Sequence, residues 1–190
     1  IVMSFESLAI MNSIKFDLNV TVDELMVYFD REKMETIIKN LLSNAFKFTP
    51  KENEIAVSLK KCDESRIEIK IRDTGIGISE EHLPKIFDRF YQVNSARTRE
   101  HGGTGIGLSL VKELVELHHG SISVDSKLGE WTEFKIILPL GNEYLTSREI
   151  VEFDNQLPLE KLTIDKSKLI HSTNHNSNSE NLITNKNIIL

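Results

Sequence analysis

The sequence predicts an α+β fold, because it contains both segments with helical periodicity and segments that alternate like strands. Within residues 31–47 the apolar side chains from Met34 to Ala45 follow the i, i+3, i+4 and i+7 spacing of a helix with one buried face. Residues 66–72 alternate charged side chains with Ile, which is the period of a strand with one buried face. Residues 54–60 alternate in the same way, so we expect the two strands to pair as a hairpin.

The same patterns predict the remaining elements. Further helices are expected at 2–12 and 105–118, and further strands at 14–20, 25–29, 121–125 and 132–138. In the first helix, Phe5 and Leu8 are expected to face the core. In the last strand, the alternation predicts inward positions for Phe134, Ile136 and Leu138.

Length and composition indicate one domain followed by a polar tail. A chain of 190 residues can bury a sizeable core, and its net charge of −6 gives no basic patch for nucleic acid. The single cysteine, Cys62, excludes an internal disulfide and a zinc cluster, and it fits a reducing compartment. No apolar run approaches the ~18 residues that a membrane-spanning helix needs.

Three polar residues lie on one line of the helix at 31–47. Asn40, Asn44 and Lys47 recur at i, i+4 and i+7 and therefore stack along the helix. At roughly 100° per residue this line falls at the edge of the apolar stripe, where amides can line a ligand site. Asn is a mediocre helix former, so two of them four residues apart need a reason. The alternative is a solvated flank of the helix that happens to hold two Asn.

An acidic residue ends the strand at 66–72. One further step of the alternation puts Asp73 on the buried side, where a carboxylate must find hydrogen-bond donors. Gly75 and Gly77 allow positive φ and close backbone approach, so a ligand with an exocyclic amine would suit Asp73. The alternative is a turn in which Asp and Gly serve conformation alone.

A second cluster of glycines, at 102–107, precedes the helix at 105–118. A glycine-rich loop at the start of a helix can bind phosphate through free backbone N–H groups and the helix dipole. The spacing fits neither the Walker nor the dinucleotide-binding pattern, because Leu occupies positions 108 and 110. The alternative is a flexible loop that only caps a buried helix.

Taken in order, these segments resemble the ATP-binding domain of sensor histidine kinases. The N, G1, F and G2 boxes of that family are similar to Asn40-x-x-x-Asn44-x-x-Lys47, Asp73-x-Gly75-x-Gly77, Ile86-Phe87-Asp88-Arg89-Phe90 and Gly103-x-Gly105-x-Gly107-Leu108. The resemblance covers about residues 1 to 140 and implies the fold shared with gyrase, Hsp90 and MutL. In this fold, called the Bergerat fold, helices cover one face of a mixed, mostly antiparallel sheet to form a two-layer α/β sandwich.

The resemblance implies roles for these residues in binding ATP and Mg²⁺. Asp73 would accept a hydrogen bond from the adenine amine. Asn44 would give an amide oxygen to Mg²⁺, Lys47 would reach the phosphates, and Phe48 would lie against the adenine face. The other residues that the resemblance places at the nucleotide are Gly75, Gly77, Ile78, Arg97, Arg99, Gly103, Thr104, Gly105, Gly107, Leu108 and Thr132.

Residues 91–101 match the mobile lid of the family. Candidate phosphate contacts in and beside the lid are Arg89, Arg97 and Arg99. Phe87 and Phe90 are expected to anchor the lid by packing. Thr132 is expected to support the adenine site, although Trp131 stands where the family usually has a second Gly in the preceding turn.

Asn40 distinguishes the branches of the superfamily. Hydrolysing members carry Glu at this position as a general base for water, and an amide cannot accept a proton at neutral pH. The catalytic set implied by the resemblance is Asn40, Asn44 and Lys47. These residues favour phosphoryl transfer to a histidine, which depends on positioning and charge neutralisation and needs little proton abstraction.

The acceptor histidine is expected outside this chain. None of the six histidines fits the family's acceptor motif, so the sequence is interpreted as a catalytic fragment that follows a histidine-containing dimerisation domain. Residues 1–141 are assigned to the ATP-binding domain, 142–185 to a polar linker, and 186–190 to a possible first strand of a receiver domain. The resemblance implies a homodimeric parent protein, a cytoplasmic domain of a membrane-anchored sensor, that acts in two-component signalling and a phosphorelay.

Two alternatives stay open at this level. The first is a non-catalytic docking module that keeps the fold and binds nucleotide weakly, which nucleotide titration would distinguish. The second is a serine kinase of the anti-sigma type, which shares the boxes and would be excluded by a helical acceptor domain preceding this one.

Overall fold

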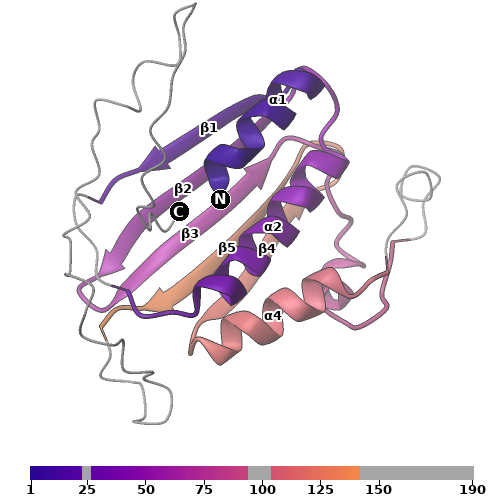
Figure 1. The fold of residues 1–190 in the computed structure, drawn as a ribbon. Coiled ribbons are helices and arrows are strands. Elements are labelled where there is room, and N and C mark those ends of the chain that lie inside the picture. Colours follow the sequence, from indigo (N-terminus) through magenta and orange to yellow (C-terminus); the bar gives the residue numbers. More distant parts are fainter. Residues whose placement is uncertain (23–26, 94–103, 142–190) are drawn as a thin grey trace, which may run out of the picture.

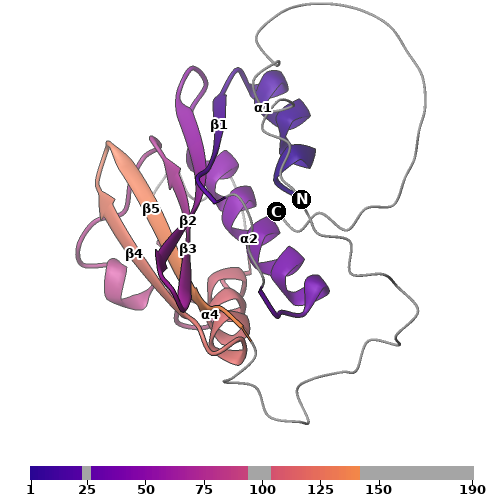
Figure 2. The ribbon, with the colours of Figure 1, turned by 90° about the vertical axis from the view of Figure 1, so that its left-hand side faces the viewer.

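A layer of strands and a layer of helices make up the domain. The computed structural model describes residues 1–22, 27–93 and 104–141. Figure 1 shows the helices lying across the sheet, and the view turned by 90° in Figure 2 shows α1, α2 and α4 on the same side of it. The predicted α+β class and the two-layer arrangement are therefore confirmed.

The sheet has the order β1-β2-β3-β5-β4. Its strands are β1 (Lys15–Val20), β2 (Glu54–Asp63), β3 (Arg66–Asp73), β4 (Ser121–Lys127) and β5 (Trp131–Pro139). The pair β1 and β2 is parallel, and the other neighbours are antiparallel. The predicted hairpin of 54–60 and 66–72 corresponds to β2 and β3, in which Ile55 lies opposite Asp73.

The helical layer begins with a 3₁₀ turn, η1 (Val2–Phe5), which runs into α1 (Glu6–Asn12). The central helix is α2 (Arg31–Phe48), and a second 3₁₀ turn, η2 (Leu83–Lys85), precedes α4 (Gly107–Leu117). Asp30 caps α2, because its carboxylate accepts a hydrogen bond from the backbone N–H of Lys33 at 3.0 Å. No helix among the described residues combines the length and the apolar character needed to cross a bilayer.

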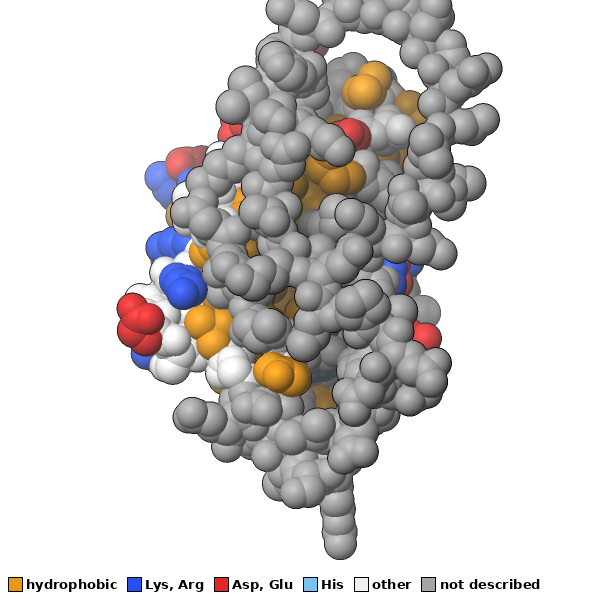
Figure 3. Space-filling view, turned by 60° about the vertical axis from the view of Figure 1, so that its left-hand side comes forward, with side chains coloured by type: hydrophobic (Ala, Val, Ile, Leu, Met, Phe, Trp, Pro, Cys, Tyr) orange, Lys and Arg blue, Asp and Glu red, His pale blue; other side chains and the backbone are white. Residues whose placement is uncertain are grey.

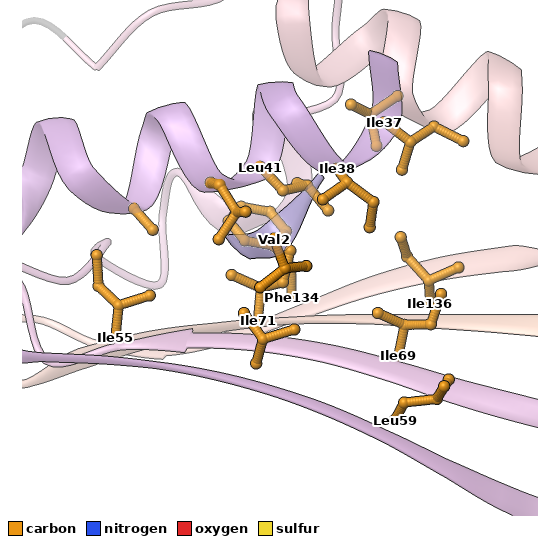
Figure 4. Close-up of a cluster of buried hydrophobic side chains, with 14 of the residues drawn as sticks. Val2, Ile37, Ile38, Leu41, Ile55, Leu59, Ile69, Ile71, Phe134 and Ile136 are labelled. Carbon is orange, nitrogen blue, oxygen red and sulfur yellow. The ribbon is translucent and has the colours of Figure 1, made fainter. Parts of the chain in front are cut away.

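The core lies between α2 and the sheet. Figure 4 shows Ile37, Ile38 and Leu41 of α2 above Ile71 and Ile136 of the strands. These side chains are at most 1% exposed. The predicted inward positions Phe134, Ile136 and Leu138 are all buried, so the alternation of the last strand is confirmed. Because full burial of one such side chain stabilises the fold by about 1.5–3 kcal/mol, this layer holds α2 firmly in place.

Two local expectations are wrong. In place of a strand at 25–29, Val27 forms one isolated parallel bridge with Gly141, and residues 28–30 are not in a strand; positions 25 and 26 lie outside the described residues. The neighbouring strand β5 ends at Pro139, which leaves little edge to pair with. Leu8 is 37% exposed, and Ala9 is the buried residue of α1. The 3₁₀ turn before α1 has three residues per turn and so shifts the phase of the helix.

The face of the sheet opposite the helices is charged. Lys70 Nζ lies 2.8 Å from Glu133 Oε1 across β3 and β5, and the Arg72 guanidinium lies 4.1 Å from the centre of the Trp131 ring. In the space-filling view of Figure 3, both basic and acidic side chains lie along the left-hand margin, beside hydrophobic side chains. Ion pairs and a cation–π contact thus lie on this face, while helices pack against the opposite face.

Candidate functional site

The polar line of α2 lies at the edge of the core, as its spacing predicts. Asn40, Asn44 and Lys47 are half-buried, whereas their apolar neighbours on the helix are almost completely buried. The Asn40 side-chain amide donates to the Thr36 carbonyl oxygen at 2.8 Å. Its other end, the amide oxygen, faces α4, because a Cβ added to Gly107 would lie 2.7 Å from it.

The second glycine cluster brings the start of α4 against two other segments. Gly107 is the first residue of α4 and faces Asn40. Gly105 has φ +70°, and a Cβ there would lie 2.7 Å from the Phe90 carbonyl carbon. The Phe90 N–H donates to the Gly105 carbonyl oxygen at 2.8 Å. The N-terminus of α4, where the first N–H groups have no partner within the helix, therefore lies next to the polar line of α2, and this is an arrangement that favours anions.

Asp73 is a buried carboxylate at the end of β3. It is 5% exposed, and its Oδ1 accepts a hydrogen bond from the Gly75 N–H at 2.9 Å. Burial raises the pKa of this carboxyl from 3.8 to about 6, and the Gly75 hydrogen bond and the charge of Arg72 lower it only in part. A ligand amine could add a second hydrogen bond to this carboxylate.

The loop after Asp73 is held against the end of α2. The Ile76 N–H donates to the Phe48 carbonyl oxygen at 3.2 Å. A Cβ at Gly75 would lie 2.3 Å from that same oxygen, so no side chain fits there. Lys47 and Phe48 are adjacent at this end of α2, where the Lys47 ammonium lies 5.0 Å from the centre of the Phe48 ring. The segments with Asp73 and Lys47 are therefore brought together.

The other side of the same loop is held by the turn between β4 and β5. Gly77 has φ +64°, and a Cβ there would lie 2.2 Å from the Lys127 carbonyl oxygen. The Gly129 N–H donates to the Ile76 carbonyl oxygen at 2.7 Å, and the Ile78 N–H donates to Ser126 Oγ at 2.8 Å.

Thr132 and Ser126 complete the surroundings of Asp73. Thr132 is buried and pairs with Asp73 across β3 and β5, so the two side chains lie on the same face of the sheet. Sequence reasoning missed Ser126. A signal was present, because the alternation of Ile122 and Val124 points position 126 inward, where a hydroxyl needs partners.

Some expected site residues are elsewhere or lie outside the described residues. Arg97, Arg99, Gly103 and most of the lid lie outside them. Arg89, a candidate phosphate contact, donates from Nε and Nη2 to Glu113 Oε1 on α4 at 3.0 and 2.7 Å. Thr104 is exposed in the loop before α4, and Leu108 is half-buried in the first turn of α4.

The two phenylalanines of the F-box segment differ. Phe87 packs edge-on against Phe134 with ring centres 6.3 Å apart, as expected for an anchor. Phe90 is 72% exposed, so its expected packing is wrong. Its positive φ of 65° turns the chain toward Gly105, and this turn directs the ring away from the core.

Comparison with known proteins decides the family. Residues 29–142 match the family described as histidine kinase-, DNA gyrase B- and HSP90-like ATPase. The chain belongs to this family. It is 47% identical over 113 residues to the sensor protein SrrB of Staphylococcus aureus, a match that covers 58% of this chain and 19% of SrrB. The chain therefore spans about a fifth of the length of that relative.

Solved structures of this family share the fold. The mycobacterial sensor histidine kinase MprB superposes with a TM-score of 0.62 at 28% identity, over 73% of this chain and 90% of that one. The catalytic domain of the histidine kinase ThkA superposes with a TM-score of 0.63 at 24% identity, over 73% of this chain and 88% of that one. Full-length ShkA, solved in complex with AMPPNP, gives a TM-score of 0.65 at 24% identity, over 74% of this chain and 28% of ShkA.

The described residues fit a metal ion shared with a bound phosphate better than a metal ion held by protein side chains alone. They contain no group of three or more His, Cys, Asp or Glu side chains that could hold a metal ion by themselves. Asn44 offers a neutral amide oxygen beside Lys47, and Mg²⁺ is commonly held by few protein oxygens together with phosphate oxygens and water. The donor set thus fits a magnesium ion that arrives with a nucleotide.

Proposed function

We propose that this domain binds Mg²⁺–ATP and transfers the γ-phosphoryl group to a histidine of a dimerisation domain in the same protein. The observation that carries the proposal is Asp73, a buried carboxylate that accepts a hydrogen bond from the Gly75 N–H and has a pKa raised to about 6. Burial of a carboxylate lowers the stability of the folded domain. Carboxylates whose pKa is strongly shifted are therefore candidates for functional residues.

The chemistry around Asp73 selects adenine. Above pH 6 the carboxylate can only accept hydrogen bonds, so it complements the exocyclic amine of adenine and repels the carbonyl oxygen that guanine carries at the same ring position. Phe48, at the end of α2, can then lie against the base, and Gly75 and Gly77 let the loop after Asp73 pack closely against the backbone of Phe48 and Lys127.

The phosphates would lie toward α4. Lys47 and the N-terminus of α4 supply positive charge and N–H groups for them. Asn44 would hold the Mg²⁺, which supplies neutralisation of the phosphate charge when bound. Gly105 and Gly107 let the start of α4 lie close to Phe90 and Asn40, and Arg97, Arg99 and Gly103 of the lid segment stay candidates for this end of the site.

Asn40 argues for transfer to a protein and against hydrolysis. Its amide donates to Thr36 and cannot take a proton from water. In the proposed reaction the bond between the γ-phosphorus and the β–γ bridging oxygen breaks, a bond from phosphorus to an imidazole nitrogen forms, and ADP leaves. Positioning and charge neutralisation carry this reaction, so the site needs no base at position 40.

The wider setting is part of the proposal. ThkA has been solved in complex with the response regulator TrrA, at 22% identity to this chain. We propose that the acceptor histidine passes its phosphoryl group to a receiver domain in a two-component pathway. The parent protein is proposed to be a homodimeric, membrane-anchored sensor with this domain in the cytoplasm.

Nucleotide binding is tested by thermal unfolding. At a Mg²⁺–ATP concentration of about 100 times Kd the domain gains about 2.7 kcal/mol, which raises Tm by roughly 5 to 11 °C. Asp73→Asn removes most of this shift, whereas Ser123→Ala, on the outer face of β4, leaves it unchanged. Absence of a shift in the unchanged chain would refute the proposal and favour a non-catalytic docking module.

Transfer is tested with radiolabelled ATP. The chain alone is expected to take up no label and to hydrolyse ATP negligibly, because it lacks a fitting acceptor and a base at position 40. Label is expected on the dimerisation domain of the same protein when that domain is supplied in trans, and Asn44→Ala is expected to reduce this transfer strongly. Steady hydrolysis by the chain alone would contradict the role given to Asn40.

A further inference from the structure

One hydroxyl beside the candidate site has no part in the proposed function. Ser126 Oγ, on the inward side of β4, contacts three groups. It lies 2.8 Å from the Ile78 N–H, 2.7 Å from the Trp131 carbonyl oxygen and 3.0 Å from Thr132 Oγ1. A serine hydroxyl has one proton to donate and two lone pairs to accept with, so these contacts use its full capacity.

The direction of each hydrogen bond follows from the chemistry of the partners. The Trp131 carbonyl oxygen can only accept, so it takes the proton of Ser126. The Ile78 N–H can only donate, and it uses one lone pair of Ser126. Because Ser126 has no second proton, Thr132 must be the donor in the contact between the two hydroxyls. The single hydroxyl proton of Thr132 is therefore directed at Ser126.

The orientation of Thr132 matters because it faces Asp73. Thr132 and Asp73 are direct partners across β3 and β5, and both are buried on the helix side of the sheet. Side chains of such partners lie about 4.5–5.5 Å apart at Cβ. With its proton held by Ser126, the Thr132 hydroxyl offers only lone pairs toward the space it shares with the Asp73 carboxylate.

We propose that Ser126 is a positioning residue that makes the base site accept hydrogen bonds at both Asp73 and Thr132, and so selects a purine with an amine at C6. The proposal deepens the proposed function and rests on it. A purine with a carbonyl oxygen at C6 would meet two acceptors and no donor. Without Ser126, the Thr132 hydroxyl can turn and donate its proton to that oxygen.

The test compares ATP with inosine triphosphate, which carries a carbonyl oxygen in place of the C6 amine. Both are titrated with Mg²⁺ onto the whole chain, and the ratio of their Kd values is measured. In Ser126→Ala the preference for ATP is expected to fall about tenfold, the value of about one hydrogen bond, in part through tighter binding of inosine triphosphate. Ser126→Thr keeps a hydroxyl and is expected to retain the preference, and Ser123→Ala on the outward face of β4 is the matched control.

The outcomes separate the proposal from a merely structural role. If Ser126 only braced the loop, Ser126→Ala would weaken both nucleotides equally and leave the ratio unchanged, which would overturn the proposal. If Ser126→Ala does not fold, Ser126→Cys decides, because a thiol is only a weak acceptor for the Thr132 proton and this variant must also lower the ratio. An unchanged chain that binds neither nucleotide refutes the proposed function itself, whereas ATP binding with an unchanged ratio in the variants refutes only the role of Ser126.

Discussion

At the scale of single residues, Asp73 is kept at a cost to stability. Burial raises the pKa of its carboxyl from the ordinary 3.8 to about 6 in the folded chain. Between these two pH values the folded chain holds one proton more than the unfolded chain. The free energy of unfolding therefore falls as the pH rises through this window, and the loss stays constant above pH 6.

Replacing this charge is expected to stabilise the free protein. A pKa rise from 3.8 to about 6 corresponds to about 3 kcal/mol, which is the order of the gain expected for Asp73→Asn at neutral pH. The Asn oxygen can still accept from the Gly75 N–H. Urea unfolding at several pH values checks this: the variant should be more stable than the original chain above pH 6, and the two should converge toward pH 4. A variant less stable than the original at neutral pH would contradict the burial argument.

The two glycines at either end of the site are expected to respond differently to alanine. At Gly75 the added Cβ would lie 2.3 Å from a backbone oxygen of Phe48, so Gly75→Ala should destabilise the domain by more than about 3 kcal/mol. At Gly107 the same Cβ would meet only the movable end of Asn40, so Gly107→Ala should change stability by less than about 1 kcal/mol. Chemical denaturation of both variants measures the difference. Equal losses would show that the loop around Gly75 can move away.

At the scale of elements, His118 joins the end of α4 to the start of α2. The ring is buried, with Nε2 accepting from the Asp30 N–H at 3.1 Å and Nδ1 2.6 Å from the Leu114 carbonyl oxygen. Since Nε2 accepts, the proton is on Nδ1 and the ring is neutral. One side chain thus satisfies a backbone group at each helix terminus.

Loss of this ring is expected to weaken the contact between the two helices. His118→Ala leaves the Asp30 N–H without its partner and should cost about 1–3 kcal/mol in the free energy of unfolding. The control is His119→Asn, since His119 is exposed and has a positive φ of 56° that Asn tolerates. Nitrogen NMR of the imidazole should show the proton on Nδ1, and a proton on Nε2 would overturn the assignment.

Elements with a strong internal pattern were predictable, and those that depend on a neighbour were not. The helix predicted at 31–47 is α2, because its apolar period and the cap at Asp30 are both local. The strand expected at 25–29 had a suitable composition, but a strand needs a partner edge, and β5 ends at Pro139. Leu8 was misplaced because the 3₁₀ turn before α1 does not show in the apolar spacing.

At the scale of the whole molecule, the described contacts form one unit that ends at Gly141. The last of them along the chain are the Leu140 N–H to the Ser65 carbonyl oxygen at 2.6 Å and the bridge of Gly141 with Val27. We predict that a chain of residues 1–141 unfolds in one cooperative step, with a Tm close to that of the full chain, and binds Mg²⁺–ATP equally well. Calorimetry of both chains tests the proposed boundary, and a large loss of Tm in the shorter chain would place it further along.

The residues that line the site were predictable from the sequence, but the hydrogen bonds that hold them in place were predictable only in part. Asn40, Asn44, Lys47 and Asp73 carry their signals in the local sequence, as polar residues at positions where apolar ones would pack. The bonds of Ser126 and of the Phe48 carbonyl oxygen join segments that are far apart along the chain, and no periodicity encodes them. Such tertiary contacts decide how the site is held, so they emerge only from the fold.

The bond between the Phe48 carbonyl oxygen and the Ile76 N–H has one more consequence. It connects the helix that carries Asn44 and Lys47 to the loop that follows Asp73. This bond therefore sets the distance between the proposed phosphate-binding and base-binding ends of the site. A nucleotide must then have a spacing between base and phosphates that matches this distance, because the site does not adjust to the nucleotide. We expect hydrogen exchange at the Ile76 amide to be equally slow with and without ATP. Faster exchange in the free chain would mean that the bond to Phe48, and with it this distance, is fixed only when the nucleotide binds.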